Sequence, residues 1–187
     1  MVHGDDKGLK IPPKIAPTQV VIVPINPKKE KSEEFSSFVM KVEEKLTHLD
    51  IRTHIDYLDE SPGFKFNKWE LKGVPIRIEI GLKEFENMEV TVCRRDNSEK
   101  YQIQIDKIDE IPTILQSIQD NLFNDAKTFM DNNTCTVSSF ADFTDTLSKN
   151  NQFIKAYWDG TDETELKIKE KTKATIRCIV EDNEDSS

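Results

Sequence analysis

The chain has 187 residues, of which 36% are hydrophobic and 33% are charged, and its formal net charge is −9. That length is sufficient to bury the core of one or two domains. No apolar run approaches the roughly 18 residues of a membrane-spanning helix, and the start MVHGDDKG lacks the apolar core of a signal peptide, so we expect a cytoplasmic protein.

The side chains and motifs that build most catalytic sites are scarce. The three cysteines form no CxxC or CxxH pair, and the three histidines are scattered. The sequence contains no GxGxxG, Walker, GxSxG or HExxH motif. We therefore expect neither a catalytic site nor a bound cofactor within these residues.

The negative charge is unevenly distributed along the chain. Residues 60–100 are neutral, whereas residues 101–187 carry −8, from 9 basic and 17 acidic side chains. A negative chain argues against a nucleic-acid partner, because phosphate binding needs lysine and arginine. The distribution weakens that objection for the middle of the chain.

The first elements alternate between strand and helix. The β-branched run QVVIVPI (19–25) predicts a buried strand, and IRTHIDY (51–57) predicts a second one. Between them, apolar residues recur at helical intervals and predict a helix over 33–46. The expected buried face of that helix consists of Phe35, Phe38, Val39, Val42 and Leu46.

The stretch SPGFKFNKWELKGVPIRIEIG (61–81) contains most of the chemistry. SPG predicts a turn, Asn67 is a candidate cap for a short helix KWELK, and Gly73 is its expected end. The alternation in residues 74–81 predicts a strand whose apolar side chains are core. Trp69 is assigned to packing.

The remaining elements complete an α/β pattern. Strands are predicted at 88–95 and 100–105, joined by the turn DNSE, and a helix at 111–129. After residue 131 the pattern restarts, with a last strand at ATIRCIV (174–180). The order predicts an α/β fold, a mixed β-sheet flanked by helices, followed by a smaller α/β domain.

Two interpretations of the 61–81 stretch remain open from its pattern. Phe66 and Glu70 are four residues apart, and Arg77 shares a strand face with Glu79. A ring, a carboxylate and a guanidinium suit an unpaired guanine, whose N1–H and amino group donate to a carboxylate, while O6 and N7 accept from Arg77 or Lys83. Alternatively, the aromatics are core and the charges form a surface pair, which the pattern alone favours.

The text of the sequence adds a resemblance. SPGFKFNKWELKGVPIRIEIG, VTVCRRDN and IKEKTKATIRCI are similar to the C-terminal part of prolyl-tRNA synthetases of the eukaryotic and archaeal type, from Met1 to about Ile179. The resemblance implies the end of a catalytic domain at 1–17, extended or disordered here, and an anticodon-binding domain at 18–130. It also implies a zinc-binding-like domain at 131–180. The acidic tail 181–187 is expected to be disordered.

The resemblance also implies site residues and their roles. The positions that match those facing the anticodon guanines of proline tRNA are Phe66, Glu70, Arg77, Lys83 and Lys100. Leu82 and Glu84 depart from the family text beside Lys83. Asp159 and Thr164 stand where the family has its first zinc-binding cysteines, so we expect no zinc.

The expected function follows from the family. The parent enzyme is a ligase that joins proline to its tRNA with ATP and magnesium and forms a homodimer. These 187 residues are expected to recognise tRNA as a monomer without aminoacylating it, because the resemblance places the catalytic motifs upstream. The alternative is a non-catalytic protein-interaction module that retains the anticodon-binding fold, which the acidic C-terminal half favours.

Overall fold

The computed structural model describes residues 3–25, 32–150 and 152–180. The chain divides into two compact units, Met1–Lys127 and Thr128–Ser187. The tail at 181–187, expected to be disordered, lies outside the described residues. Within the described part, no helix is both long and apolar enough to cross a membrane.

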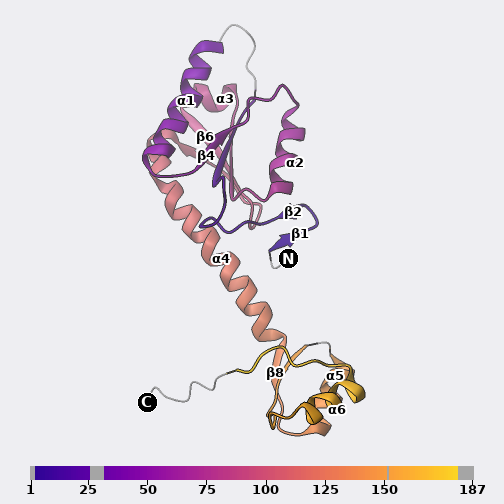
Figure 1. The fold of residues 1–187 in the computed structure, drawn as a ribbon. Helices are drawn as coiled ribbons and strands as arrows, with labels where there is room; N and C mark the ends of the chain where they lie inside the picture. Colours follow the sequence, from indigo (N-terminus) through magenta and orange to yellow (C-terminus); the bar gives the residue numbers. More distant parts are fainter. Residues whose placement is uncertain (1–2, 26–31, 151, 181–187) are drawn as a thin grey trace, which may run out of the picture. The chain divides into compact units, whose positions relative to one another are not determined.

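A five-stranded mixed sheet forms the centre of the first unit, in the order β4-β3-β5-β6-β7 (Figure 1). The strands are β3 (Val20–Pro24), β4 (Thr53–Ile55), β5 (Ile76–Ile80), β6 (Glu89–Arg94) and β7 (Lys100–Gln104). β3 runs parallel to β4 and β5, and β6 is antiparallel to β5 and β7. Helices flank this sheet, which confirms the predicted α/β class.

The main core lies on the sheet face that α1 (Ser32–His48) and α4 (Ile111–Asn132) cover. The 3₁₀ helix η2 (Ile105–Glu110) connects β7 to α4. All five residues of the stripe predicted for α1 are buried, and so are Ile76, Ile78 and Ile80 of β5. Phe85 of α3 (Leu82–Glu86), a helix that the sequence did not predict, packs edge-on against the same core.

The opposite face of the sheet carries α2 (Pro62–Lys72), which lies across from α1 in Figure 1. A smaller cluster forms there from Trp69, Val74 and the two β3 residues Val21 and Val23. Trp69 is buried, which confirms its assignment to packing.

The helix α2 begins five residues before the predicted Asn67 cap, so that prediction was wrong. The Ser61 side chain accepts a hydrogen bond from the Phe64 N–H, and Pro62 occupies the first turn, where its missing N–H costs nothing. The helix ends as predicted at Gly73, whose φ of 72° is left-handed. Phe66 therefore lies inside the helix and not at its entrance.

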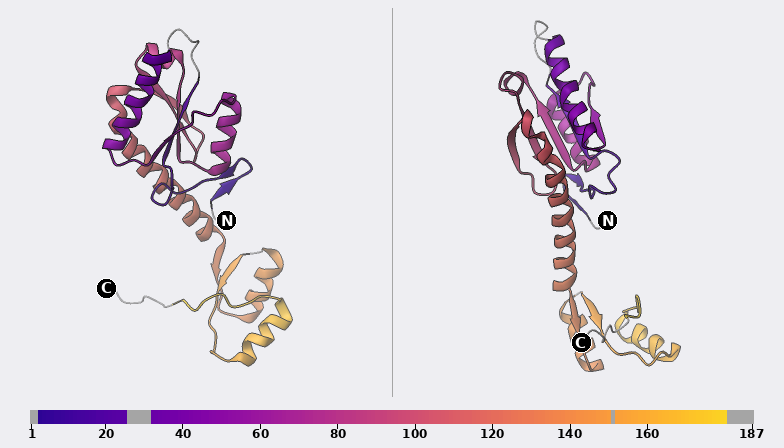
Figure 2. Two further views of the ribbon diagram at one scale, coloured as in Figure 1. Left: turned by 45° about the horizontal axis from the view of Figure 1, so that its top comes forward. Right: turned by 90° about the vertical axis from the view of Figure 1, so that its left-hand side faces the viewer.

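Residues 3–17 have a defined structure, contrary to the expectation of an extended or disordered segment. Strands β1 (Gly4–Asp5) and β2 (Gly8–Leu9) form a hairpin beside the C-terminal end of α2 (Figure 2). The Ile11 N–H donates to the Gly73 carbonyl at 3.0 Å, and Ala16 is buried. These contacts with the rest of the first unit order the segment.

The second unit consists of short elements. They are β8 (Thr134–Thr136), α5 (Phe140–Lys149), β9 (Phe153–Lys155) and α6 (Asp162–Thr172), with β8 and β9 parallel. The strand predicted at 174–180 does not form, because no described segment pairs with it, and Ile179 and Val180 are exposed. No described residue from 128 to 180 is classed as buried.

Replacing Gly73 tests the contact between the hairpin and α2. A Cβ at Gly73 meets the Leu9 backbone at 2.6 Å, in addition to its left-handed φ. We expect Gly73→Ala to lower the free energy of unfolding of the first unit by about 2–4 kcal/mol. Urea unfolding can be followed by Trp69 fluorescence in chains that carry Trp158→Phe.

The matched control is Gly63→Ala in the first turn of the same helix. A Cβ there meets nothing within 4 Å, so alanine should leave stability unchanged or raise it by about 0.5–1 kcal/mol. Equal effects of the two substitutions would contradict the proposed packing of the hairpin on α2.

Candidate nucleic-acid interface

The register of the sheet aligns three polar side chains in one row. Arg77 of β5 is paired with Cys93 of β6, and Cys93 is paired with Lys100 of β7. Directly paired residues share a face of the sheet. This face is the one opposite the main core, since the β5 residues Ile76 and Ile78 alternate with Arg77 and point into that core.

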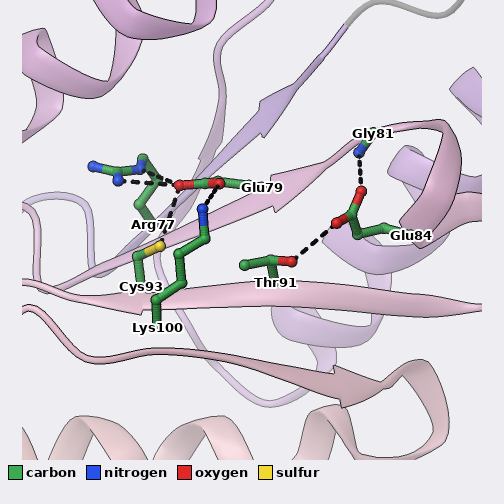
Figure 3. A network of polar contacts seen from close by, with 7 residues as sticks. All are labelled: Arg77, Glu79, Gly81, Glu84, Thr91, Cys93 and Lys100. Atoms are coloured by element: carbon green, nitrogen blue, oxygen red, sulfur yellow. Dashed lines mark hydrogen bonds and ion pairs between the residues drawn. The ribbon is translucent and has the colours of Figure 1, made fainter.

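A buried carboxylate, Glu79, connects the row (Figure 3). Its Oε1 accepts hydrogen bonds from Nε and Nη2 of Arg77, both at 3.1 Å, and from the Cys93 thiol at 3.1 Å. Its Oε2 forms an ion pair with the Lys100 ammonium. Glu79 is only 4% exposed, whereas the Lys100 side chain is 54% exposed. A buried anion thus holds two cations at the surface.

The network changes the acidity of its members. Burial by itself raises the pKa of Glu79, but hydrogen bonds from Lys100 and Cys93 and the charge of Arg77 outweigh it, so the pKa lies below its usual value. Burial and the Glu79 carboxylate raise the pKa of Cys93 to about 11. Cys93 is therefore a protonated hydrogen-bond donor and not a nucleophile.

Phe66 supports the guanidinium of Arg77 from the helix side. The Arg77 Cζ lies 4.3 Å from the centre of the Phe66 ring, a cation–π contact. With Nε and Nη2 bound to Glu79, Nη1 is the guanidinium nitrogen that has no acceptor in the described part of the chain. Arg77 is fixed on two sides and retains donor capacity for a ligand.

A cavity of about 200 Å³ lies beside this row. Its lining includes Glu70, Arg77 and Lys100, together with Lys7 from the β1–β2 hairpin. Drug-sized ligands occupy pockets of roughly 300–1,000 Å³, so this cavity suits a smaller group such as a single base.

Glu70 contributes a carboxylate that is free to bind. Its backbone carbonyl accepts from Arg95 Nε at 3.2 Å and from the Gly73 N–H. Its carboxylate has no hydrogen-bond or ion-pair partner within the described ranges, although cationic side chains share the cavity. A carboxylate acceptor beside donors that can still form hydrogen bonds is the arrangement that a base with both donors and acceptors requires.

Two expected site residues do not line this cavity: Phe66, which contacts Arg77 at its edge, and Lys83. Lys83 is exposed on α3, which follows the far end of β5 from Arg77. Glu84 organises that helix, since its carboxylate accepts from the Gly81 N–H at 3.0 Å and from the Thr91 hydroxyl at 3.1 Å (Figure 3). The residue that departs from the family text therefore caps α3.

Asp56, which the sequence analysis missed, positions α2. This buried carboxylate follows β4 and accepts from the Trp69 indole N–H at 2.6 Å and from Lys68 at 3.0 Å, and its carbonyl accepts from Lys65. Burial raises the pKa of Asp56, but the bonds from Trp69 and Lys68 hold it below its ordinary value. A tryptophan assigned to packing needs an acceptor for its N–H, which was the available signal.

The C-terminal unit does not fit a zinc ion. Asp159 Oδ1 accepts from the Thr161 N–H and hydroxyl, and Oδ2 accepts from the Thr164 hydroxyl at 2.7 Å. These bonds lower the pKa of Asp159 and engage its oxygens with the start of α6, whose N-cap is Thr161. No group of three or more His, Cys, Asp or Glu residues that could hold a metal occurs within residues 3–25, 32–150 and 152–180.

Comparisons with known proteins agree with this geometry. Residues 19–116 match the family model described as an anticodon binding domain, and residues 140–187 match the model described as the C-terminal region of prolyl-tRNA synthetase. The chain is 45% identical over 184 residues to a proline–tRNA ligase of Natranaerobius thermophilus, and 45% identical over 181 residues to one of Flavobacterium johnsoniae.

A solved structure is also similar to this chain. A prolyl-tRNA synthetase from Cryptosporidium parvum, crystallised with L-proline and AMP, matches 92% of the chain with a TM-score of 0.84 and 37% identity. The chain spans about 37% of the length of that protein and of the curated relatives above, and about 96% of the chain is matched by those relatives.

Glu79→Gln tests the buried anion at the centre of the row. The substitution keeps the size of the side chain and removes the charge that holds Arg77 and Lys100, so we expect the free energy of unfolding at pH 7 to fall by about 1–3 kcal/mol. An exposed carboxylate in the turn between β6 and β7 provides the control, and Glu99→Gln should cost less than about 0.5 kcal/mol.

The pH dependence separates the charge from the shape of Glu79. Because its folded pKa lies below the ordinary glutamate value of 4.5, its stabilising contribution is complete above pH 4.5 and is lost as the pH falls through the folded pKa. The difference in unfolding free energy between the unmodified chain and Glu79→Gln should therefore shrink in acid. A difference that stays constant in urea titrations from pH 7 into this range would contradict the ionic role.

Proposed function

The chain belongs to the family of anticodon-binding domains, and from this premise we propose that its first unit binds the anticodon of a proline tRNA and reads its guanines. The observation that carries the proposal is the unpaired Glu70 carboxylate in a cavity shared with Arg77 and Lys100. The domain assignment is residues 18–130 for anticodon binding and 131–180 for the zinc-binding-like domain without zinc.

Guanine is the base that matches the donors and acceptors of the cavity. Its N1–H and amino group are adjacent donors for the Glu70 carboxylate, and O6 and N7 accept from the free Nη1 of Arg77 or from Lys100. Adenine offers neither the N1–H nor the O6 acceptor. The guanidinium plane of Arg77, which rests on the Phe66 ring, provides a flat surface at the cavity on which an unpaired base stacks.

The proposed role in a longer protein follows the curated relatives, which are proline–tRNA ligases. We assign the joining of proline to tRNA, with its need for ATP and magnesium, to that longer protein, and we expect the 187 residues by themselves to be inactive in aminoacylation. A cytoplasmic location and a homodimeric parent belong to the same proposal. Sedimentation of the 187-residue chain should report a monomer.

Glu70→Ala tests guanine recognition. The dissociation constants of the 187-residue chain are measured for proline tRNA and for a variant whose anticodon guanines are replaced by adenines. We expect the unmodified chain to prefer the guanine form, and Glu70→Ala to remove about 1–3 kcal/mol of that preference, since the bidentate contact is lost. Glu60→Ala, which removes an exposed carboxylate outside the cavity, should keep the preference.

Lys83→Ala separates base reading from general attraction. Lys83 lies on α3 outside the cavity, so its loss should weaken the binding of both tRNAs by the same factor and reduce the salt dependence of that binding. Equal affinities of the unmodified chain for the two tRNAs would overturn guanine recognition. Binding to neither tRNA would favour the protein-interaction module instead.

A further inference from the structure

The β1–β2 hairpin brings a fourth charged side chain, Lys7, to the cavity that Glu70, Arg77 and Lys100 line. Lys7 is exposed and lies 63 positions before Glu70 in the sequence. No carboxylate pairs with its ammonium among the residues that the structure describes. Lys100, in contrast, is paired with Glu79. Lys7 is thus the cation at this cavity whose charge is not compensated.

The position of Lys7 is fixed by an ion pair between the buried Arg95 and the exposed Asp5. The Arg95 guanidinium donates to both oxygens of Asp5, at 2.9 and 2.7 Å, and Asp5 Oδ1 also accepts from the Lys7 N–H at 2.9 Å. Arg95 is buried, and its Nε donates to the carbonyl of Glu70. Asp5 therefore connects the backbone of Lys7, through Arg95, to the backbone of Glu70.

The approach of the hairpin leaves little freedom at its turn. A Cβ at Gly8 would meet Leu71 Cα at 2.5 Å, and the φ of Gly8 is +133°. The backbone beside Lys7 is therefore packed against α2, and the long lysine stem extends from a fixed point. Hydrogen bonds of Asp5 with Arg95 hold the pKa of Asp5 well below its usual range, so the ion pair persists at neutral pH.

We propose that Lys7 binds a backbone phosphate of the RNA strand whose base occupies the cavity. The inference rests on the proposed function and adds a contact from outside the anticodon-binding domain proper. Glu70 and Arg77 supply the acceptor and the donor that a base edge needs, whereas Lys7 is an exposed, uncompensated point charge, which suits a phosphate. The hairpin therefore contributes affinity, and the sheet and α2 contribute base selection.

The test compares two lysines of the same segment in the 187-residue chain. Lys7→Ala removes the proposed contact, and Lys14→Ala removes an equally exposed charge that lies beside a different depression, lined by Gln119 and Asp50. Dissociation constants for proline tRNA and for its adenine variant are measured over a series of salt concentrations. Equal thermal unfolding midpoints establish that the variants remain folded.

Lys7→Ala should weaken the binding of both tRNAs by the same factor, about 3- to 10-fold at low salt. It should also reduce the slope of the logarithm of the binding constant against the logarithm of the salt concentration by about 0.7–0.9. Lys7→Arg should retain the slope. Lys14→Ala should change neither quantity appreciably.

Three results would decide against parts of this account, and they are distinguishable. If the unmodified chain prefers guanine but Lys7→Ala behaves like Lys14→Ala, the phosphate contact is wrong while the proposed function stands. If Lys7→Ala weakens binding only to the tRNA that has the anticodon guanines, Lys7 contacts a base, and the phosphate role is overturned. If the unmodified chain binds neither tRNA, the proposed function fails, and this inference fails with it.

Discussion

The placement of α2 against the sheet is the constraint on which the candidate site depends. The buried Asp56 carboxylate binds the Trp69 indole and the Lys68 ammonium. Next to them, the Gly73 carbonyl accepts from the Ile11 N–H, and Arg95 donates to the Glu70 carbonyl. Both anchors are polar groups away from bulk water, where a hydrogen bond is strong and its loss costly. Glu70 is therefore presented from a part of the helix that both sets of bonds hold in place.

The second constraint is the buried Glu79. Strand register places cationic side chains on one face of the sheet, and the bonds of Glu79 hold them there as a binding surface. Arg77 and Lys100 lie two strands apart on one sheet face and repel each other, and the Glu79 carboxylate that binds both offsets that repulsion. Arg77 and Lys100 are oriented before any ligand arrives. Binding therefore does not lose free energy in ordering these two side chains, and the affinity is higher for it. The thiol of Cys93 donates the remaining hydrogen bond, so this cysteine has a structural role.

The sequence predicted the elements whose periodicity is set by the core and failed where tertiary contacts decide. β3 was predicted because a strand buried on both faces is a continuous β-branched run, and the stripe of α1 because burial on one face enforces a helical period. The start of α2 at Pro62 was missed, since the cap chosen was Asn67 and not Ser61. The strand at 174–180 was predicted from local alternation, but a strand also needs a partner, and none is described.

The candidate site shows the same division between local and long-range information. Phe66 and Glu70 could be paired from helical spacing, and the family resemblance added Lys100, but spacing could not predict that Cys93 lies between Arg77 and Lys100. That arrangement depends on the register of two strand pairings. The contribution of the hairpin was equally hidden, because the Asp5–Arg95 pair joins residues 90 positions apart.

The charge of the cavity also resolves the objection that an acidic chain is a poor partner for RNA. Surface charges interact only within about 8 Å at physiological ionic strength, so the net charge of −9 matters less than the groups at the cavity. There Asp5 compensates Arg95, and Glu79 compensates one of the two cations Arg77 and Lys100. The other cation and Lys7 face the single carboxylate of Glu70, which leaves one positive charge in excess. An excess this small limits attraction to phosphate in general, so that a base must also fit before the RNA is held.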